Sequence, residues 1–179
     1  MKIRLAQSLE SDSIVDGQGV RTVIWTQGCR HNCKGCHNPL THSFTSGFLI
    51  DIEEIKKEIA NLKIQDGITF SGGDPMCQPL PCLEIAKYCK QLGLNIWCYT
   101  GYTFEQLLEM DTAKEFLKYI DVLVDSKFIL EQRSLDLKFK GSRNQRIIDV
   151  KKSLENKQVI LITKYDKEVI KEVKKEIYI

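Results

Sequence analysis

Three cysteines lie close together near the amino terminus, in the segment Cys29-Arg-His-Asn-Cys33-Lys-Gly-Cys36. Three thiolates at this spacing can each bind one iron of a four-iron cluster, which leaves the fourth iron open to an exogenous ligand. Structural zinc is the main alternative, because a histidine would complete a tetrahedral Cys₃His site. The candidate histidines are His31, His37 and His42. The segment by itself predicts a metal centre and leaves iron and zinc both open.

The other four cysteines have a simpler interpretation. Cys82, Cys89 and Cys98 fall within helix or strand patterns, which is typical of small buried side chains. Cys77 follows a glycine-rich turn and is not included in the ligand set. The chain begins with no apolar run of the signal-peptide kind, and no segment approaches the ~20 apolar residues of a membrane span. We therefore expect a cytoplasmic protein whose cysteines stay reduced.

Polar residues follow several of the expected strands. Ser71-Gly72-Gly73-Asp74-Pro75 comes directly after an apolar strand, where paired glycines let a ligand approach the backbone and Asp74 could pair with an ammonium group. A plain turn between strand and helix is the alternative. Thr100, Asp125 and Lys127 follow later strands and could contact a ligand, although an Asp–Lys pair at this spacing is usually a solvated surface pair.

A polar, basic loop precedes the strand expected at 146–150. Its residues Arg143, Asn144, Gln145 and Arg146 could bind carboxylates of a partner protein through arginine forks, and a surface loop without a partner is the alternative. Lys and Arg number 26 against 24 Asp and Glu, a net charge of +2 that predicts neither a nucleic-acid nor a membrane partner.

Apolar β-rich runs alternate with amphipathic helical patterns along the chain. Strands are expected at 20–26, 67–70, 94–99, 121–124, 146–150 and 159–163, and helices at 52–62, at 80–92, from about 103 and after 166. Strands separated by helices form βα units. A closed eight-unit barrel takes roughly 250 residues, so the 179 residues predict an α/β fold with one domain over 1–179, an open, partial (β/α)₆-type barrel.

Six segments between about residues 12 and 150 together resemble the radical S-adenosylmethionine superfamily. They are Asp16-Gly-Gln-Gly-Val-Arg21, the cysteine segment continued as His37-Asn-Pro39, Ser71-Gly-Gly-Asp-Pro75, Tyr99-Thr-Gly-Tyr102, Val122-Leu-Val-Asp-Ser-Lys-Phe128 and Gly141-Ser-Arg-Asn-Gln-Arg-Ile-Ile-Asp149. More narrowly, the chain resembles the anaerobic ribonucleoside-triphosphate reductase-activating proteins. It departs from the usual patterns at Gln18, where the family usually has proline, at Gly35, where many superfamily members carry an aromatic residue, and at Asp74, where glutamate is common.

The resemblance implies a radical SAM fold and an activating enzyme. Cys29, Cys33 and Cys36 would hold a 4Fe–4S cluster whose fourth iron is chelated by S-adenosylmethionine. The residues implied near that cofactor are Gly35, Cys36, His37, Ser71, Gly72, Gly73, Asp74, Thr100, Asp125 and Lys127. The implied reaction makes a 5′-deoxyadenosyl radical and installs a glycyl radical on the large chain of anaerobic ribonucleoside-triphosphate reductase, with a one-electron donor such as a flavodoxin. The alternatives are action on another glycyl-radical enzyme or on a small molecule, and a zinc-binding interaction module.

Overall fold

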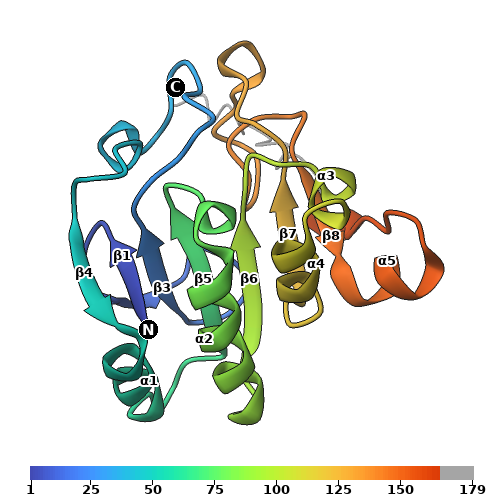
Figure 1. Ribbon diagram of the computed structural model, residues 1–179. Coiled ribbons are helices and arrows are strands. Elements are labelled where there is room, and N and C mark those ends of the chain that lie inside the picture. Colours follow the sequence, from blue (N-terminus) through green and yellow to red (C-terminus); the bar gives the residue numbers. More distant parts are fainter. Residues whose placement is uncertain (166–179) are drawn as a thin grey trace, which may run out of the picture.

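Eight strands form one mixed sheet in the computed structural model, which describes residues 1–165. The strands are β1 (Lys2–Leu5), β2 (Glu10–Ser13), β3 (Arg21–Thr26), β4 (Phe48–Asp51), β5 (Gly67–Gly72), β6 (Asn95–Tyr99), β7 (Val122–Asp125) and β8 (Arg146–Asp149). Their order across the sheet is β4-β1-β3-β5-β6-β7-β8, and β2 pairs with β3 (Figure 1). The sheet does not close on itself.

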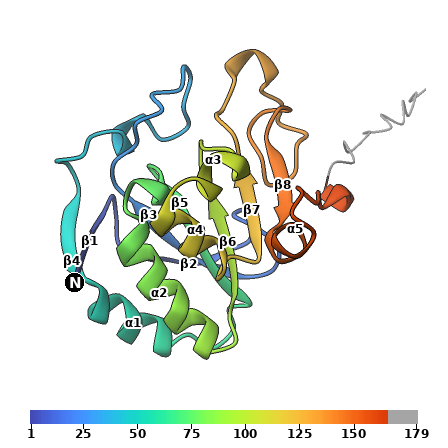
Figure 2. The ribbon, with the colours of Figure 1, turned by 45° about the vertical axis from the view of Figure 1, so that its right-hand side comes forward.

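The α-helices are α1 (Ile52–Ala60), α2 (Pro79–Gln91), α3 (Phe104–Leu108), α4 (Asp111–Leu117) and α5 (Val150–Asn156). Helix α1 begins at Asp51, whose carboxylate accepts a hydrogen bond from the backbone N–H of Glu53. Helix α3 begins with a reciprocal capping box between Thr103 and Gln106. Helices α1, α2 and α4 lie on the same face of the sheet (Figure 2).

Strands β3, β5, β6 and β7 are parallel and form the centre of the sheet. Their runs of apolar, β-branched and aromatic residues suit strands that are covered on both faces. The carboxyl ends of parallel strands meet at one edge of a sheet, the upper edge in Figure 1. The cysteine segment, the glycine turn and the loops after β6 and β7 therefore all leave from this edge.

The expected open, partial α/β barrel is confirmed, with differences at both edges of the sheet. Strand β8 runs antiparallel to β7, and β1, β2 and β4 pair antiparallel, so four strands rather than six are parallel. The prediction of a strand at 159–163 is wrong. The chain there makes an isolated bridge between Leu161 and Ile148 and then a 3₁₀ helix, Thr163–Tyr165. The helix expected after 166 lies outside the described residues.

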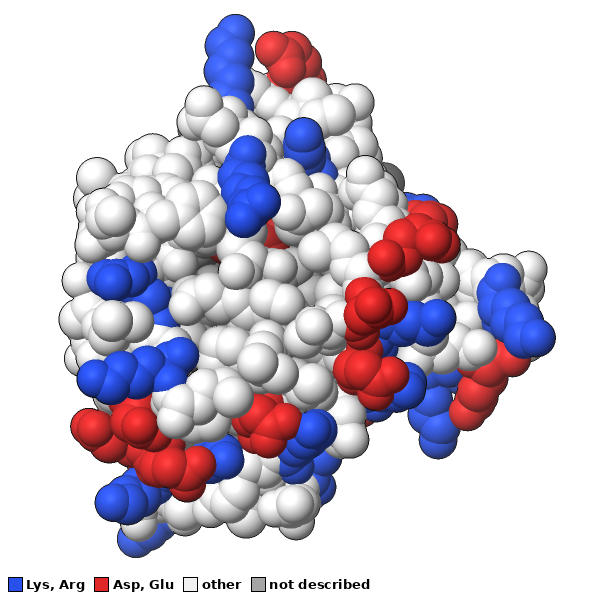
Figure 3. All heavy atoms as spheres, viewed as in Figure 1, with Lys and Arg blue, Asp and Glu red and all other residues white. Residues whose placement is uncertain are grey.

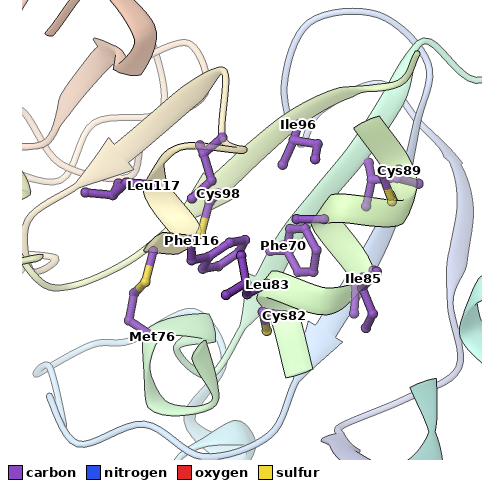
Figure 4. Packing of buried hydrophobic residues seen from close by; sticks show 14 of the residues in the cluster. Phe70, Met76, Cys82, Leu83, Ile85, Cys89, Ile96, Cys98, Phe116 and Leu117 are labelled. Carbon is purple, nitrogen blue, oxygen red and sulfur yellow. The ribbon is translucent and has the colours of Figure 1, made fainter. Parts of the chain in front are cut away.

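The main core lies between the sheet and its helices. Phe70 from β5 and Phe116 from α4 meet edge to face with ring centroids 5.2 Å apart (Figure 4). Cys82, Cys89 and Cys98 are all fully buried in this core, which confirms their interpretation as packing residues. Burial raises the pKa of Cys89 to about 12, so this side chain remains a thiol at neutral pH.

The opposite face of the sheet holds a fully buried arginine near the amino ends of the parallel strands. The Arg21 guanidinium donates to Thr69 Oγ1 at 2.6 Å, to the backbone oxygen of Ile68 at 2.6 Å and to that of Asn95 at 3.0 Å. These acceptors come from β5 and β6, the two strands that follow β3 across the sheet. Burial lowers the pKa of Arg21 to about 10, so it stays charged and its hydrogen bonds cross-link the three strands.

Charged side chains of both signs are interspersed along the lower part of the face shown in Figure 3. This mixing agrees with the small net charge of +2. Among the described residues, no helix has the length and apolar character needed to cross a membrane.

Two ion pairs of Arg146 join β7, β8 and α3: one with buried Asp125 and one with exposed Glu105. Arg146 donates to Asp125 through Nε at 2.9 Å and through a second nitrogen at 2.5 Å, and its guanidinium also binds Glu105 at 2.8 Å. The Asp125 side chain is completely buried and also accepts from the backbone N–H of Phe104. A buried carboxylate without its cation is costly, so Arg146 holds the edge of the sheet together.

Replacing Arg146 with alanine should lower the free energy of unfolding by about 3 kcal/mol, because Asp125 would stay buried without its cation. Urea unfolding measures this change. Lys152→Ala is the control: it breaks an exposed pair with Asp149 at 2.9 Å and should cost less than about 1 kcal/mol. Equal losses in the two variants would contradict the role given to Arg146.

Acid should weaken the ion pair between Arg146 and Glu105. Arg146 lowers the pKa of Glu105 to about 2 in the folded protein, whereas an unpaired glutamate titrates near about 4.3. The stabilisation is therefore complete above the unfolded value and is lost as the pH falls towards about 2. Thermal unfolding across this range should show a steeper loss in the wild type than in Glu105→Gln, and parallel curves would count against the pair.

Candidate functional site

The three clustered cysteines line one cavity of about 150 Å³ at the carboxyl edge of the parallel strands. Cys29, Cys33 and Cys36 come from the loop that follows β3, and all three are partly exposed. The opposite walls come from the loops after β5, β6 and β7, so four segments that are distant in sequence surround the thiols.

Backbone N–H groups lie around each of the three sulfur atoms. Those of His31 and Asn32 are close enough to the Cys29 sulfur to favour its thiolate, and Asn32 has the left-handed φ of 47° that lets neighbouring N–H groups point the same way. The N–H of Phe128 acts similarly on Cys33, and that of Asn38 donates to Cys36 Sγ at 3.4 Å. Hydrogen bonds to cysteine sulfur are a regular feature of iron–sulfur sites, so the donor set fits a cluster.

Burial nevertheless raises the pKa of Cys29 and of Cys33. The metal-free cavity therefore favours thiols, and a bound iron would displace their protons. A four-iron cluster needs each thiolate on a different iron, so its ligands surround a cavity and do not converge on one point. Across residues 1–165, no three His, Cys, Asp or Glu side chains form a group that could hold a single metal ion.

The three histidines considered as zinc ligands have different surroundings. His31 Nε2 lies 2.8 Å from an Asp74 oxygen, so that nitrogen already has a partner. His37 is exposed at the cavity mouth, and its ring lies 4.9 Å from that of Phe128. His42 also lines the cavity, and its Nε2 is buried without a hydrogen-bond partner.

The glycine turn closes tightly against the loop that carries the cysteines. A Cβ on Gly73 would lie 2.4 Å from the backbone oxygen of Gly28, and one on Gly72 would lie 2.5 Å from that of Thr26, so neither position accepts a side chain. The backbone N–H of Gly73 donates to the Thr26 oxygen at 2.7 Å, and that of Asp74 to the Gly28 oxygen at 2.9 Å. The turn is therefore part of the cavity wall, not a plain exposed turn.

The Asp74 carboxylate points into the protein and is completely buried. Its hydrogen-bond donors are the backbone N–H of Met76 (2.9 Å), Thr100 Oγ1 (2.9 Å), the backbone N–H of Gly101 (2.9 Å) and His31 Nε2 (2.8 Å). A carboxylate has about four acceptor positions. The sequence predicted an ammonium group at the Asp74 carboxylate. Its acceptor positions are occupied by hydrogen-bond donors of the protein itself.

The other residues expected near a cofactor divide into two groups. Cys36, His37, Ser71, Gly72, Gly73, Asp74 and Thr100 line the cysteine cavity. Gly35, Asp125 and Lys127 do not belong to this lining: Gly35 is exposed beside Leu130, Asp125 is buried against Arg146, and Lys127 is exposed. Asp125 and Lys127 lie at the carboxyl end of β7, as the sequence indicates. The sequence could not show in which direction their side chains point.

The four residues expected to bind a partner mostly brace their own loop. Asn144 donates to the backbone oxygen of Lys127 at 2.8 Å, and Gln145 accepts from the N–H of Gly141 at 2.8 Å. Arg146 is engaged with Asp125 and Glu105. Arg143 is exposed. Asn144, Gln145 and Arg146 therefore stabilise their own part of the chain.

A second cavity, of about 500 Å³, adjoins the first on the face of the sheet away from the helices. Ser71, Tyr99, Phe128 and Gln145 line both cavities, so the two share a wall. Val15 and Leu135 also line the larger cavity, and they are 72% and 86% exposed. Exposed apolar side chains at the mouth of a cavity can contact another polypeptide.

Sequence reasoning missed the contribution of Tyr99 and Phe128 to the site, and it considered His31 only as a zinc ligand and Gln145 only as a partner contact. Tyr99 ends the strand β6, and Phe128 and Gln145 lie at the two ends of the loop between β7 and β8. The order of the strands brings these positions together, so no local pattern could have identified them. In the sequence, Tyr99 and Phe128 were marked only by lying within the segments that resemble the radical S-adenosylmethionine superfamily.

Comparisons with known proteins agree with this geometry. Residues 15–148 match the family described as a 4Fe-4S single cluster domain. Anaerobic ribonucleoside-triphosphate reductase-activating proteins from Vibrio cholerae and Haemophilus influenzae are 40% and 36% identical over 143 residues, which are 75% of this chain and 90% of each relative. The pyruvate formate-lyase-activating enzyme of Clostridium pasteurianum is 35% identical over 156 residues, 83% of this chain and 62% of that enzyme.

Among solved structures, QueE from Escherichia coli is similar with a TM-score of 0.48 and 16% identity, over 57% of this chain and 53% of QueE. The match to the cluster-domain family spans the cysteine loop, the glycine turn and every wall of the cysteine cavity. With the extent and identity of the matches to the activating proteins, it shows that the chain belongs to the 4Fe-4S single cluster domain family and, within it, to the anaerobic ribonucleoside-triphosphate reductase-activating proteins.

Proposed function

We propose that this protein is a radical S-adenosylmethionine activase that installs a glycyl radical on anaerobic ribonucleoside-triphosphate reductase. The observation that carries the proposal is the shared cavity of Cys29, Cys33 and Cys36, which also contains the glycine turn. The names of the relatives, which match over 90% of their length, support the choice of reductase.

The three cysteines would hold a 4Fe–4S cluster, and the fourth iron would be free to bind the cofactor. When bound, the cluster supplies the one electron that cleaves S-adenosylmethionine to methionine and a 5′-deoxyadenosyl radical, which then takes a hydrogen atom from a glycine Cα of the partner. The chain's own contribution is placement and the exclusion of water.

The cavity walls suggest how the chain would orient S-adenosylmethionine. Gly72 and Gly73 line the cavity, so the methionine end of the cofactor would contact main-chain atoms of the turn there. Ser71 and Thr100 add hydroxyl groups to the walls, and His37 lies at the mouth towards the adenine end. Gly35, Asp125 and Lys127 would act from outside this wall, by shaping the loops that carry it.

The larger cavity supports a polypeptide substrate. It is open to solvent and shares Ser71 and Tyr99 with the cysteine cavity, so an inserted loop could reach the cofactor. Exposed Val15 and Leu135 at its mouth are suited to contact with another protein. We assign this cavity to the glycine-bearing segment of the reductase, and we expect a one-electron donor such as a flavodoxin to serve the cluster.

A second candidate is activation of a different glycyl-radical enzyme. The 35% identity to the pyruvate formate-lyase-activating enzyme of Clostridium pasteurianum favours it as the alternative. The chemistry at the cluster would be the same in both cases. The two candidates differ only in the polypeptide that enters the larger cavity.

Replacing Cys29, Cys33 or Cys36 with alanine should each prevent assembly of the cluster and abolish cleavage of S-adenosylmethionine, because each thiolate binds a different iron. Anaerobic reconstitution followed by iron analysis and detection of 5′-deoxyadenosine measures both effects. Cys89→Ala is the matched control and should keep iron and cleavage, since Cys89 is buried in the main core. A wild-type protein that binds stoichiometric zinc and no iron would refute the cluster.

The choice of substrate is tested by mixing the reduced, reconstituted protein with S-adenosylmethionine and the reductase. Electron paramagnetic resonance should then show the doublet of a glycyl radical on the reductase. Pyruvate formate-lyase under the same conditions is the comparison. A doublet only on the lyase, from a protein that cleaves the cofactor, would exclude the reductase and support the second candidate.

A further inference from the structure

His31 lies between Cys29 and Cys33 and lines the cysteine cavity, but its ring nitrogen Nε2 is already bound to Asp74. Its side chain is 7% exposed, and Nε2 lies 2.8 Å from Asp74 Oδ2. A carboxylate only accepts hydrogen bonds, so Nε2 carries the hydrogen and donates it. The contact joins the cysteine loop to the glycine turn, 43 residues further along the chain.

The imidazole fits a slot that leaves little freedom. It meets the ring of Tyr102 edge to face with centroids 4.5 Å apart. A Cβ on Gly101 would lie 2.4 Å from the imidazole, so glycine at this position makes room for it. The loop is thus fixed by packing as well as by the hydrogen bond.

Asp74 is well suited to anchor this histidine. It is completely buried, and three other donors, from Met76, Thr100 and Gly101, hold its carboxylate in place. A buried carboxylate with four hydrogen-bond donors is held rigidly in place. A direct bond to the ammonium group of S-adenosylmethionine would have to displace one of these donors.

The main chain of His31 acts on the nearest cluster ligand. Burial raises the pKa of Cys29, and the backbone N–H groups of His31 and Asn32 lie close enough to its sulfur to act against that rise. Hydrogen bonds to the sulfur ligands help to set the reduction potential of an iron–sulfur cluster. Because the ring and the N–H belong to one residue, the bond from the ring to Asp74 restrains the position of the N–H beside Cys29.

We propose that His31 is a positioning residue: its bond to Asp74 holds the cysteine loop, keeps the backbone N–H groups of that loop beside the Cys29 sulfur, and thereby helps to set the cluster potential. In this arrangement Asp74 is the anchor of the loop, and the methionine ammonium group is bound by other atoms of the cavity wall. The effect on the potential rests on the proposed cluster. The fixing of the loop does not, because it concerns the metal-free chain.

The first test therefore uses metal-free protein and measures the rate at which iodoacetamide alkylates each cysteine, by peptide mass spectrometry. His31→Phe keeps an aromatic ring and removes the donor, so the loop should open and expose both thiols. Burial affects the pKa of Cys29 and of Cys33 more than the backbone N–H groups do, so the two cysteines should react about tenfold faster, the factor expected for loss of one hydrogen bond. His31→Gln places an amide N–H near the position of Nε2 and should return the rates to within about twofold of wild type.

Lys34→Gln is the matched control in the same loop, because the Lys34 side chain is 82% exposed and lies 4.0 Å from Glu131. It should leave the rates unchanged. Buried Cys89 and Cys98 are internal references for folding. If they too become reactive in His31→Phe, Gly101→Ala serves as the second variant, since its methyl group would displace the imidazole and should give the same faster alkylation of Cys29. Unchanged Cys29 rates in a folded variant would overturn the proposal.

The second test uses reconstituted protein and measures the potential of the cluster by a redox titration followed by electron paramagnetic resonance. Weaker N–H contacts to sulfur stabilise the reduced cluster less, so His31→Phe should shift the potential to more negative values and His31→Gln should restore it. An unshifted potential in a fully loaded His31→Phe variant would overturn the role of His31. Failure of the wild type to assemble a cluster would instead refute the proposed function, and the alkylation result would still stand.

Binding of S-adenosylmethionine to the loaded protein distinguishes an anchor from a ligand. If Asp74 acts as the anchor of His31, His31→Phe should raise the Kd several-fold, because the loop loses its support. If Asp74 binds the ammonium group directly, His31→Phe frees one of its acceptor positions and should leave the Kd unchanged or lower, and that result would overturn the anchor role.

Discussion

A buried carboxylate organises the active edge of this protein. Asp74 receives hydrogen bonds from the cysteine loop, from its own turn and from the loop after β6, so three segments are held to one charged group. A charge in the protein interior is tolerated only when it is fully hydrogen-bonded. The loops supply the hydrogen-bond donors that Asp74 needs, and Asp74 in turn fixes the distances between the loops. The cavity around the cysteines is the space that remains between them.

The amino and carboxyl ends of the parallel strands differ in their structural role. At the amino ends, Arg21 cross-links β3, β5 and β6, and the Gln18 side chain accepts hydrogen bonds from Lys164 and Tyr165. These contacts use neutral acceptors and leave that end fixed. At the carboxyl ends, the chain turns through glycines and exposes backbone N–H groups to sulfur. Rigidity at one end lets loops of irregular conformation keep a precise arrangement at the other.

The sequence allowed some parts of this arrangement to be predicted and not others. The central strands and helices α1 and α2 follow from periodicity and capping residues, and the cysteine and glycine segments follow from residue type and spacing. Strands β1 and β4 are short and pair at an edge, where the apolar pattern is weak, so they were not predicted. A strand was wrongly predicted at 159–163, which shows that an apolar run does not always pair with a neighbouring strand of the sheet.

The contacts made by side chains were the least predictable. Asp125 and Arg146 were expected at the rim, facing a cofactor and a partner, yet they face each other because register pairs them across β7 and β8. Asp74 was expected to meet an ammonium group, and the structure gives it a histidine from the cysteine loop. In both cases the residue type correctly indicated a need for an opposite charge or a donor. The partner was set by tertiary structure, which no local pattern encodes.

The reversed direction of β8 has a consequence for how the family can diversify. Because β8 runs antiparallel to β7, the segment 126–145 starts and ends at the same edge of the sheet, with Asp125 paired to Arg146 at its base. A loop whose two ends are fixed side by side can gain or lose residues at a small entropic cost, which grows only with the logarithm of its length. Insertions there would reshape the rim of the larger cavity, the proposed substrate entrance, without altering the strand register. Substrate range can thus evolve at this one loop while the cysteines and their supports stay unchanged.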